Sequence, residues 1–173
     1  MSGAELAPPY LAPRYELGRD LIALRLGLTA LEAAQLGPAF AAIDPWARYP
    51  YPASALTAYL AKAEPHAPRY AVLDGAVIIG ALGLRLDWLR GPYVQFLAVL
   101  PANQTRGIGA LILAWVERQA LASAERNLWV AASDFNTGAL RFYERHGFSR
   151  VADLDGLVRE GRKEILLRKR IAD

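Results

Sequence analysis

The stretch from Tyr93 to Gln119 constrains the fold of this chain more than any other part of the sequence. Residues 93–100 are apolar and rich in β-prone side chains, and Pro101 ends the run, so they predict a buried strand. Residues 104–110 contain two glycines, and the apolar residues after them recur at the spacing of one helical face. A glycine-rich turn that leads into a helix directs unpaired backbone N–H groups and the positive end of the helix dipole to one place. The stretch therefore predicts a strand, a turn and a helix, with a turn suited to binding phosphate.

Residues 104–110 fit two other phosphate-binding loops less well. A Walker loop has a lysine followed by Ser or Thr after its last glycine, where this chain has Ala110 and Leu111. A dinucleotide-binding fingerprint has a third glycine, and Leu111 and Ile112 occupy that region. The structural alternative is a plain strand-to-helix turn, in which glycine serves only backbone freedom.

Outside this stretch, the sequence predicts a mixed order of strands and helices. Thr29 followed by Glu32 is a capping box, which predicts a helix that ends near Ile43. Asp74-Gly75 between two apolar runs is a strong hairpin signal. Further helices are expected after Ser54, after the glycine turn and from Thr137 to His146, and strands at 21–26, 69–73, 77–84, 93–100, 128–132, 148–151 and 164–168. This order predicts an α/β (α+β) fold, with a mixed central sheet of six to seven strands flanked by helices.

The sequence predicts an N-terminal arm followed by one folded domain. Residues 1–19 are rich in Ala and Pro and lack periodicity, so we expect an N-terminal arm that is loose or supported by a partner. Residues 20–173 are expected to form a single domain, since the length suffices for one core and no repeat is visible.

The composition narrows the kind of protein. Apolar residues make up 54% of the chain and charged residues 21%, which is typical of globular proteins. The absence of cysteine excludes disulfides and thiolate chemistry, and with only two distant histidines, His66 and His146, we expect no metal site. No run approaches ~20 apolar residues and no signal-peptide pattern is present, so a cytoplasmic protein without a membrane partner is expected. The net charge is +3, and the basic residues are scattered along the chain rather than clustered, so we expect no nucleic-acid partner.

A second stretch suggests which ligand the glycine turn binds. It runs Asn136-Thr137-Gly138-Ala139-Leu140-Arg141-Phe142-Tyr143-Glu144-Arg145-His146-Gly147-Phe148. Its asparagine, alanine, aromatic-Tyr pair and Gly-Phe, together with Gln104-x-x-Gly107-x-Gly109, resemble the GNAT superfamily of acyl-CoA-dependent N-acyltransferases. The resemblance covers about residues 21–168. It implies the GNAT fold, acetyl-CoA as co-substrate and a homodimer.

The resemblance also implies how coenzyme A is held. Main-chain groups of Leu97 and Val99, where their strand splays from its neighbour at a bulge, pair with the pantetheine amides. Backbone N–H groups of the turn hold the pyrophosphate, with a side-chain contact from Gln104 or Arg106, and Asn136 adds another. The implied coenzyme A residues are Leu97, Ala98, Val99, Gln104, Thr105, Arg106, Gly107, Ile108, Gly109, Ala110, Asn136 and Tyr143. In purely structural terms the strand residues are core, and Asn136 is a helix cap worth ~1 kcal/mol.

The sequence suggests an acid but no base. Tyr143 lies two helical turns from Asn136 on the same face, and its hydroxyl is the expected general acid for the leaving thiolate; packing is its structural alternative. Some GNAT enzymes carry a glutamate five residues before the asparagine, where this chain has Ala131. Three carboxylates remain as candidates without an assignment: Asp87, Asp134 and Glu164. A Ser133 nucleophile would need a histidine partner, and His146 is not assumed to be one.

The acceptor is not identified by the sequence. Five aromatic residues predict either an apolar or flat acceptor surface or core packing: Trp46, Tyr49, Tyr51, Trp88 and Tyr93. The expected function is an acetyl-CoA-dependent N-acetyltransferase in which a primary amine attacks the thioester directly. A protein or peptide N-acyltransferase and a non-catalytic acyl-CoA-binding sensor are the alternatives.

Overall fold

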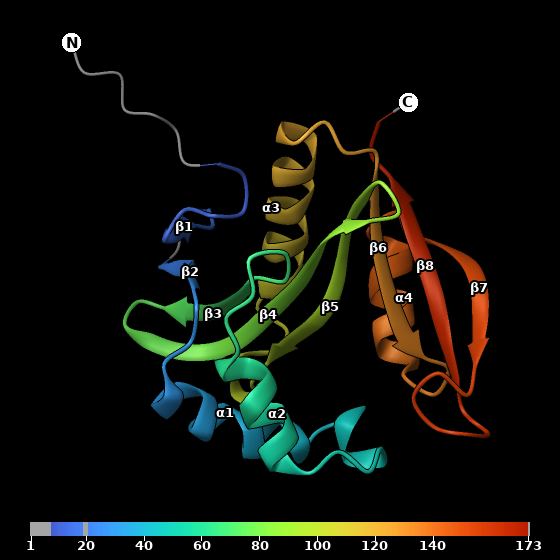
Figure 1. Cartoon of the computed structure of the whole chain (residues 1–173), viewed down its shortest axis with the longest axis horizontal. Coiled ribbons are helices and arrows are strands. Elements are labelled where there is room, and N and C mark those ends of the chain that lie inside the picture. The colour runs from blue at the N-terminus through green and yellow to red at the C-terminus, as the bar shows by residue number, and fades with distance from the viewer. Residues whose placement is uncertain (1–7, 19–20, 173) are drawn as a thin grey trace.

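The computed structural model describes residues 8–18 and 21–172, which form an eight-stranded sheet with helices on both faces (Figure 1). The strand order is β1-β2-β3-β4-β5-β6-β8-β7, and neighbouring strands are antiparallel except for β5 and β6. The strands are β1 (Arg14–Glu16), β2 (Ile22–Leu26), β3 (Arg69–Asp74), β4 (Val77–Trp88), β5 (Gly91–Val99), β6 (Asn127–Ser133), β7 (Ser149–Asp155) and β8 (Lys163–Arg170). The helices are α1 (Ala30–Ala41), α2 (Ala53–Ala61), α3 (Ile108–Ala122) and α4 (Thr137–Arg145), with 3-10 turns η1 (Trp46–Arg48) and η2 (Pro101–Asn103). The predicted mixed sheet with flanking helices is confirmed.

The two faces of the sheet carry separate cores. On one face, α1 and α2 pack against β4 and β5, with Phe40 beside Phe96. On the other face, α3 and α4 cover the sheet, with Trp115 of α3 fully buried (Figure 1). Because side chains alternate along a strand, the adjacent residues Ala81 and Leu82 of β4 belong to different cores.

Two local signals in the sequence have the predicted structure. Thr29 Oγ1 accepts a hydrogen bond from the Glu32 N–H at 3.2 Å, and Glu32 Oε2 accepts one from the Thr29 N–H at 2.8 Å, which completes the capping box of α1. Gly75, with a φ of +60°, and Ala76 form the turn between β3 and β4, directly after Asp74 at the end of β3. Each of these positions depends on short-range geometry, which is why the sequence reveals it.

Residues 8–18 differ from the loose arm that was predicted. Strand β1 pairs with β2, and the side chains of Tyr10 and Leu17 are buried. The Tyr10 hydroxyl donates to Glu125 Oε2 at 2.7 Å, and the Tyr10 N–H donates to Gln119 Oε1 at 3.1 Å. The prediction was wrong for these residues because tertiary contacts, rather than a periodic pattern, order them. Strand β1 is also the eighth strand, beyond the six to seven expected; residues 1–7 and 19 of the predicted arm lie outside the described residues.

The start of one helix and the end of one strand also differ from prediction. Helix α2 begins at Ala53 with Pro52 in the N-cap position, so Ser54 lies inside the first turn and does not cap it. Strand β4, predicted to end at residue 84, continues to Trp88, so that only Leu89 and Arg90 separate it from β5; their φ angles are +39° and +64°.

The sheet opens at its only parallel pair within the described residues, between β5 and β6. These strands pair at Tyr93 with Trp129 and at Val94 with Val130, and then separate. On the other side of β5, Gly83 pairs with Phe96 and Leu84 with Val94, so Gln95 bulges without a partner on β4. A bulge adds local bend and twist, and this one begins where β5 leaves β6. The bulge and splay expected for this strand are therefore present, and they create the opening in which the site lies.

No helix in residues 8–18 and 21–172 combines the length and apolar character needed to cross a membrane.

Candidate active site

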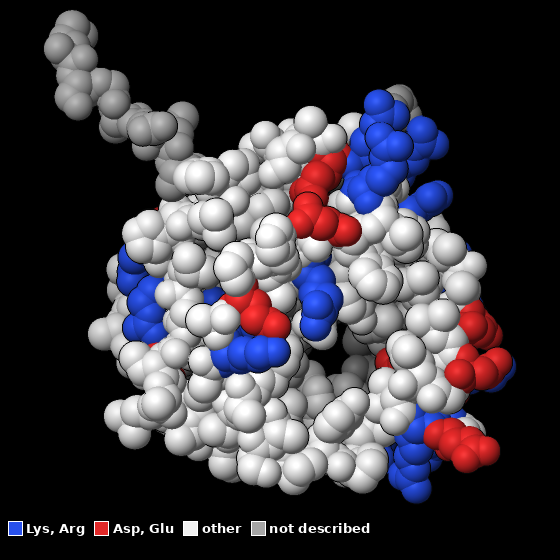
Figure 2. All heavy atoms as spheres, in the orientation of Figure 1, with Lys and Arg blue, Asp and Glu red and all other residues white. Residues whose placement is uncertain are grey.

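A cavity of about 340 Å³ occupies the opening between β5 and β6. Figure 2 shows it as a hollow near the middle of the visible face. Its lining comes from β5, β6, the loop after α1, α2, α4, the loop after β7 and the start of β8. Because the two strands part here, residues from both faces of the sheet reach one cavity. A site of this shape can bring a donor from the α3–α4 side to an acceptor on the α1–α2 side.

The turn before α3 presents backbone groups without a side-chain cap. Gly107 is the N-cap residue, with a φ of +73°, and no side chain caps the helix there. Thr105 also has a positive φ, of +66°, so the chain curves sharply just before the helix. This arrangement leaves the first N–H groups of α3 directed outward, which is the geometry that favours an anion.

The two glycines of this turn serve different needs. A Cβ on Gly107 would meet no atom within 4 Å, so its left-handed backbone is what favours glycine there. A Cβ on Gly109 would lie 2.9 Å from Cζ of Phe142, so this glycine permits close packing of α3 on α4. The absence of a side chain at Gly109 leaves room for the Phe142 ring.

Two side chains of the turn already have partners. Gln104 Nε2 donates to the carbonyl oxygen of Val99 at 2.9 Å, and Arg106 Nη1 lies 2.8 Å from Oδ2 of Asp74 at the end of β3. The Val99 carbonyl, predicted to be free for a ligand, thus accepts a hydrogen bond from the Gln104 side-chain amide. Both contacts are on exposed side chains and can exchange at modest cost.

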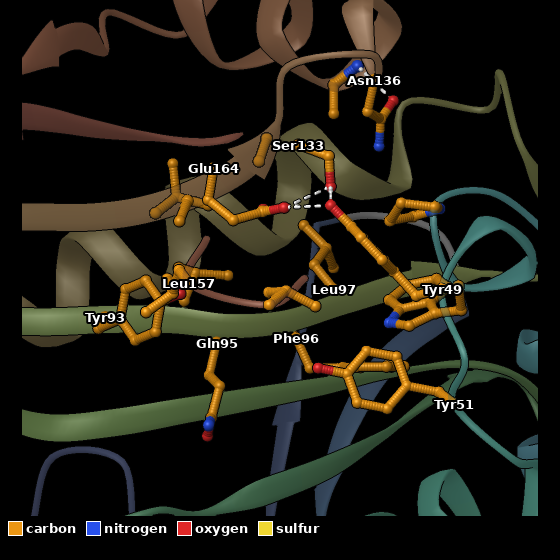
Figure 3. A pocket seen from close by; sticks show the side chains of 18 of the residues that line it. Tyr49, Tyr51, Tyr93, Gln95, Phe96, Leu97, Ser133, Asn136, Leu157 and Glu164 are labelled. Atoms are coloured by element: carbon orange, nitrogen blue, oxygen red, sulfur yellow. Dashed lines mark hydrogen bonds between the residues drawn. The ribbon is translucent and has the colours of Figure 1, made fainter. Parts of the chain in front are cut away.

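Asn136 uses its two amide atoms in different ways. Its Oδ1 accepts a hydrogen bond from the Ala139 N–H at 3.2 Å and so caps α4. Its amide nitrogen points away from the helix, and the residue lines the cavity (Figure 3). The capping role and a ligand contact therefore do not compete for the same atom.

Tyr143 lies on the same face of α4 as Asn136, as predicted, and both line the cavity. The Tyr143 side chain is buried against Phe142 and Phe148. Burial, with a smaller contribution from Tyr93, raises the pKa of Tyr143 well above its usual range. The hydroxyl is therefore protonated at neutral pH and can donate a proton or a hydrogen bond.

The three candidate carboxylates lie in different places. Asp87 is exposed and lies 2.8 Å from His66 Nδ1, and Asp134 is exposed after β6; neither lines the cavity. Glu164, at the start of β8, is buried and lines it. His146 contacts the Phe142 carbonyl at 2.7 Å and does not approach Ser133.

Glu164 forms a hydrogen-bonded cluster with Tyr49 and Ser133 (Figure 3). The Ser133 hydroxyl donates to Glu164 Oε1 at 2.8 Å, and the Tyr49 hydroxyl donates to the same oxygen. The hydroxyls of Tyr49 and Ser133 are 2.9 Å apart. Burial and the bond to Glu164 raise the pKa of Tyr49 to about 12, so this hydroxyl remains a donor.

Four of the five predicted aromatic residues line the cavity. Trp46 stacks on Phe96 at 4.7 Å between ring centroids, and Tyr49 and Tyr51 meet edge to face at 6.1 Å. Tyr93 forms the wall on β5, whereas Trp88 packs on Tyr93 outside the cavity. The aromatic residues therefore both pack and form the cavity surface. Across the part of the chain that the structure describes, no group of three or more His, Cys, Asp or Glu side chains is arranged to hold a metal ion.

The sequence model of the acetyltransferase (GNAT) family matches residues 32–148, from α1 through the end of α4. The chain belongs to the GNAT family. The match spans both the glycine turn and the Asn136–Tyr143 helix. No curated protein matches this chain.

Solved GNAT structures have the same fold. A putative GNAT acetyltransferase from Desulfovibrio desulfuricans is 21% identical, with a TM-score of 0.71 over 87% of this chain and 99% of its own. A probable GNAT acetyltransferase from Chromobacterium violaceum is 20% identical, with a TM-score of 0.71 over 90% of both chains. A GNAT acetyltransferase from Elizabethkingia anophelis, with acetyl-CoA bound, is 19% identical, with a TM-score of 0.66 over 88% of this chain and 99% of its own.

The Tyr49–Ser133–Glu164 cluster is where this GNAT chain departs from the pattern that the sequence suggested. Ala131, the position at which the resemblance led us to look for a glutamate, lines the cavity. The sequence indicated Glu164 only as one of three unassigned carboxylates, and Tyr49 only as one of five aromatic residues in either an acceptor surface or core packing. The signal that could have found the cluster is the pairing of β6 with β8, which sets Ser133 beside Glu164 but has no local sequence motif.

Proposed function

We propose that this protein is an N-acetyltransferase that transfers the acetyl group of acetyl-CoA to a primary amine by direct attack. The observation that carries the proposal is the opening between β5 and β6, into which Asn136 and Tyr143 of α4 reach from one side and Glu164 from the other. Membership of the GNAT family and a similarly folded GNAT structure with acetyl-CoA bound support the same donor.

The residues of the donor side fit coenzyme A. The uncapped start of α3, from Thr105 to Ala110, supplies N–H groups for the pyrophosphate. The β5 segment Leu97–Val99 lies beyond the last pair with β6, so its backbone can pair with the pantetheine amides. Binding there requires Gln104 to leave the Val99 carbonyl, and Arg106 can exchange Asp74 for a phosphate. The Asn136 amide nitrogen offers a further donor to the ligand.

Tyr143 is the proposed general acid. As the amine nitrogen bonds to the thioester carbon, the C–S bond breaks and negative charge develops on sulfur. A hydrogen bond from the buried Tyr143 hydroxyl stabilises that charge, and transfer of its proton completes the thiol. Burial also disfavours a free thiolate, which increases the benefit of a donor at this place.

Release of free thiol from acetyl-CoA tests the proposal. The wild-type protein is incubated with acetyl-CoA and either 2-phenylethylamine, a polyamine or a short peptide with a free N-terminus, and thiol is measured over time. We expect amine-dependent thiol release with acetylation of the amine confirmed by mass. Tight acetyl-CoA binding without release from any acceptor would instead indicate a non-catalytic sensor, and release with the peptide alone would indicate a peptide-modifying enzyme.

A further inference from the structure

We propose that Glu164 binds the ammonium group of the acceptor amine and takes its proton, with Tyr49 and Ser133 as the residues that position the carboxylate. The inference rests on the proposed acetyl transfer and adds the group and the acceptor class that the family resemblance leaves open.

The first argument is the geometry of the carboxylate. Glu164 is 7% exposed, and Ser133 and Tyr49 are 2% and 8% exposed, so what remains accessible lies at the cavity. Both hydroxyls donate to Oε1, which fixes the carboxylate and leaves Oε2 as the oxygen that neither of them occupies. Figure 3 shows the three side chains converging from β8, β6 and the segment after η1. A carboxylate held in this way is ready to accept a further hydrogen bond from a ligand.

The second argument is charge. Glu164 is the single charged residue in the lining formed by described residues, and it takes part in none of their salt bridges. A buried carboxylate without a cation is costly, because hydroxyl donors replace only part of its hydration. An ammonium group in the cavity removes that cost, whereas a carboxylate on the ligand increases it. The cavity is therefore selective for a cation.

The charged groups on adjoining elements, apart from Asp134, face away from the cluster. Lys163, next to Glu164 on β8, lies 3.8 Å from Asp153 and 3.5 Å from Asp155 of β7. Two arginines, Arg48 and Arg162, lie over the ring of Phe135, and the other ionisable groups facing the cluster are Asp134, Tyr93 and Tyr143. Burial raises the pKa values of both tyrosines, and that of Tyr143 lies well above its usual range, so Tyr143 stays protonated through the pH range of the test.

The third argument is strand register. Ser133 pairs with Glu164 across β6 and β8, and Ala131 pairs with Leu166. Residues two apart on a strand share a face, so Ala131 and Glu164 are diagonal neighbours on the same face, on the order of 7–8 Å apart. Position 131 on β6 has no carboxylate, but Glu164 on the neighbouring strand β8 supplies one to the same cavity.

The walls around Glu164 define the class of acceptor. They are aromatic or aliphatic, with Trp46, Tyr51 and Phe96 on one side and Leu157 on the other. Leu157 is 60% exposed and lines the cavity, so it adds an apolar side chain at the solvent edge of the wall. The acceptor class is a primary amine on an apolar or aromatic body that carries no negative charge near the amine.

The proposed reaction exchanges one C–S bond for one C–N bond and moves two protons from nitrogen. The ammonium group gives one proton to Glu164, and the neutral nitrogen forms the C–N bond while the C–S bond breaks. Tyr143 gives a proton to the sulfur, and the second proton lost from nitrogen as the amide forms replaces it on Tyr143. Glu164 then releases its proton to solvent, so that the products are the amide, the free thiol and one proton.

Glu164→Gln tests the base, because the change keeps the shape and the hydrogen bonds to Oε1 but removes basicity. At pH 7 we expect kcat/KM for 2-phenylethylamine to fall about 100-fold. Near pH 10, where the amine loses its proton unaided, the loss is expected to shrink to about tenfold or less. The affinity for acetyl-CoA, measured by calorimetry, should be unchanged. The matched control is Glu160→Gln, which removes one exposed carboxylate outside the cavity and should keep the wild-type profile.

The outcomes separate this inference from the proposed function. Wild-type protein that releases no thiol with any acceptor overturns the acetyl transfer itself. Wild-type turnover with a Glu164→Gln loss that is the same at every pH overturns the base. Tyr49→Phe reports on positioning: we expect about a tenfold loss alone and no further loss when it is added to Glu164→Gln. A further loss in the double variant would contradict a role through Glu164.

A matched pair of acceptors tests the charge argument. Phenylalanine has the body of 2-phenylethylamine with a carboxylate beside the amine. We expect its kcat/KM to be at least about 100-fold lower, because the added carboxylate faces Glu164 in a desolvated cavity. Equal use of the two acceptors would overturn the proposed acceptor class.

Discussion

The two sides of the cavity are built in different ways. The donor side comes almost entirely from one segment, from the bulge at Gln95 through the Gly107 turn to Tyr143 on α4. The acceptor side is assembled from segments far apart in the sequence, since Tyr49 follows η1 and Glu164 begins β8. Turns and caps within one segment encode the donor side, whereas strand register and tertiary packing create the acceptor side. Substitutions on the donor side should therefore change acetyl-CoA binding or the acid step, whereas substitutions on the acceptor side should change the use of the acceptor amine.

The largest effect is expected from Tyr143→Phe. Loss of the hydroxyl should lower kcat about 100- to 1000-fold while acetyl-CoA affinity changes little, because the ring still fills its place beside Phe148. Since the pKa of Tyr143 is raised, the acid form persists as pH rises, and the wild-type rate should not fall through loss of this proton below pH 10. Steady-state thiol release from pH 6 to 10 measures both.

The control for that change is Tyr15→Phe, which removes a hydroxyl that accepts a bond from the Ala12 N–H away from the cavity. It should leave kcat at the wild-type value. Unchanged turnover in Tyr143→Phe at every pH would show that the tyrosine only packs.

Asn136 allows the two uses of one amide to be separated. Asn136→Ala should lower the free energy of unfolding by about 1 kcal/mol, because α4 loses its cap. Asn136→Asp keeps a capping oxygen and removes the amide donor, so stability should hold while acetyl-CoA affinity falls about tenfold. Urea unfolding and calorimetric titration check the two effects. Equal acetyl-CoA affinity in wild type and the aspartate variant would restrict Asn136 to capping.

A smaller effect is expected from Thr29→Ala at the start of α1, which supports the acceptor side only through the fold. Loss of the capping box should lower the free energy of unfolding by about 1 kcal/mol, with kcat unchanged at 25 °C. Burial raises the pKa of Glu32, but bonds from Arg25 and Thr29 outweigh it and lower that pKa below its usual value. The stabilisation is therefore present above the unfolded-state pKa and is lost as pH falls through the lowered one. Urea unfolding at pH 7 and pH 3 should show a smaller penalty at pH 3, and an equal penalty would contradict the role of the ionised Glu32.

Much of the fold and the donor side could be predicted from the sequence. The Thr29 box, the Asp74-Gly75 turn and the Gly107 turn depend on residues within a few positions of one another, so their chemistry is visible in the chain. The same is true of Asn136 and Tyr143, which helical spacing sets on one face.

The remainder depends on distant contacts. Strand β1 is ordered by pairing with β2 and by the burial of Tyr10, neither of which has a local pattern. The packing of Gly109 against Phe142 joins two motifs that were read separately. The position of Glu164 beside Ser133 follows from the register of β6 and β8, which a single sequence does not specify.

Calorimetric titration of acetyl-CoA into three variants tests the division between the two sides most directly. Gly107→Val forces a branched side chain into a left-handed backbone at the start of α3 and should weaken acetyl-CoA binding at least about tenfold. Gly161→Val is the matched control, since Gly161 has a φ of +74° and equally open surroundings but lies away from that turn. We predict that it and Glu164→Gln both bind acetyl-CoA with wild-type affinity. Wild-type binding by Gly107→Val, or binding lost in Glu164→Gln, would contradict the assignment of the donor and acceptor sides.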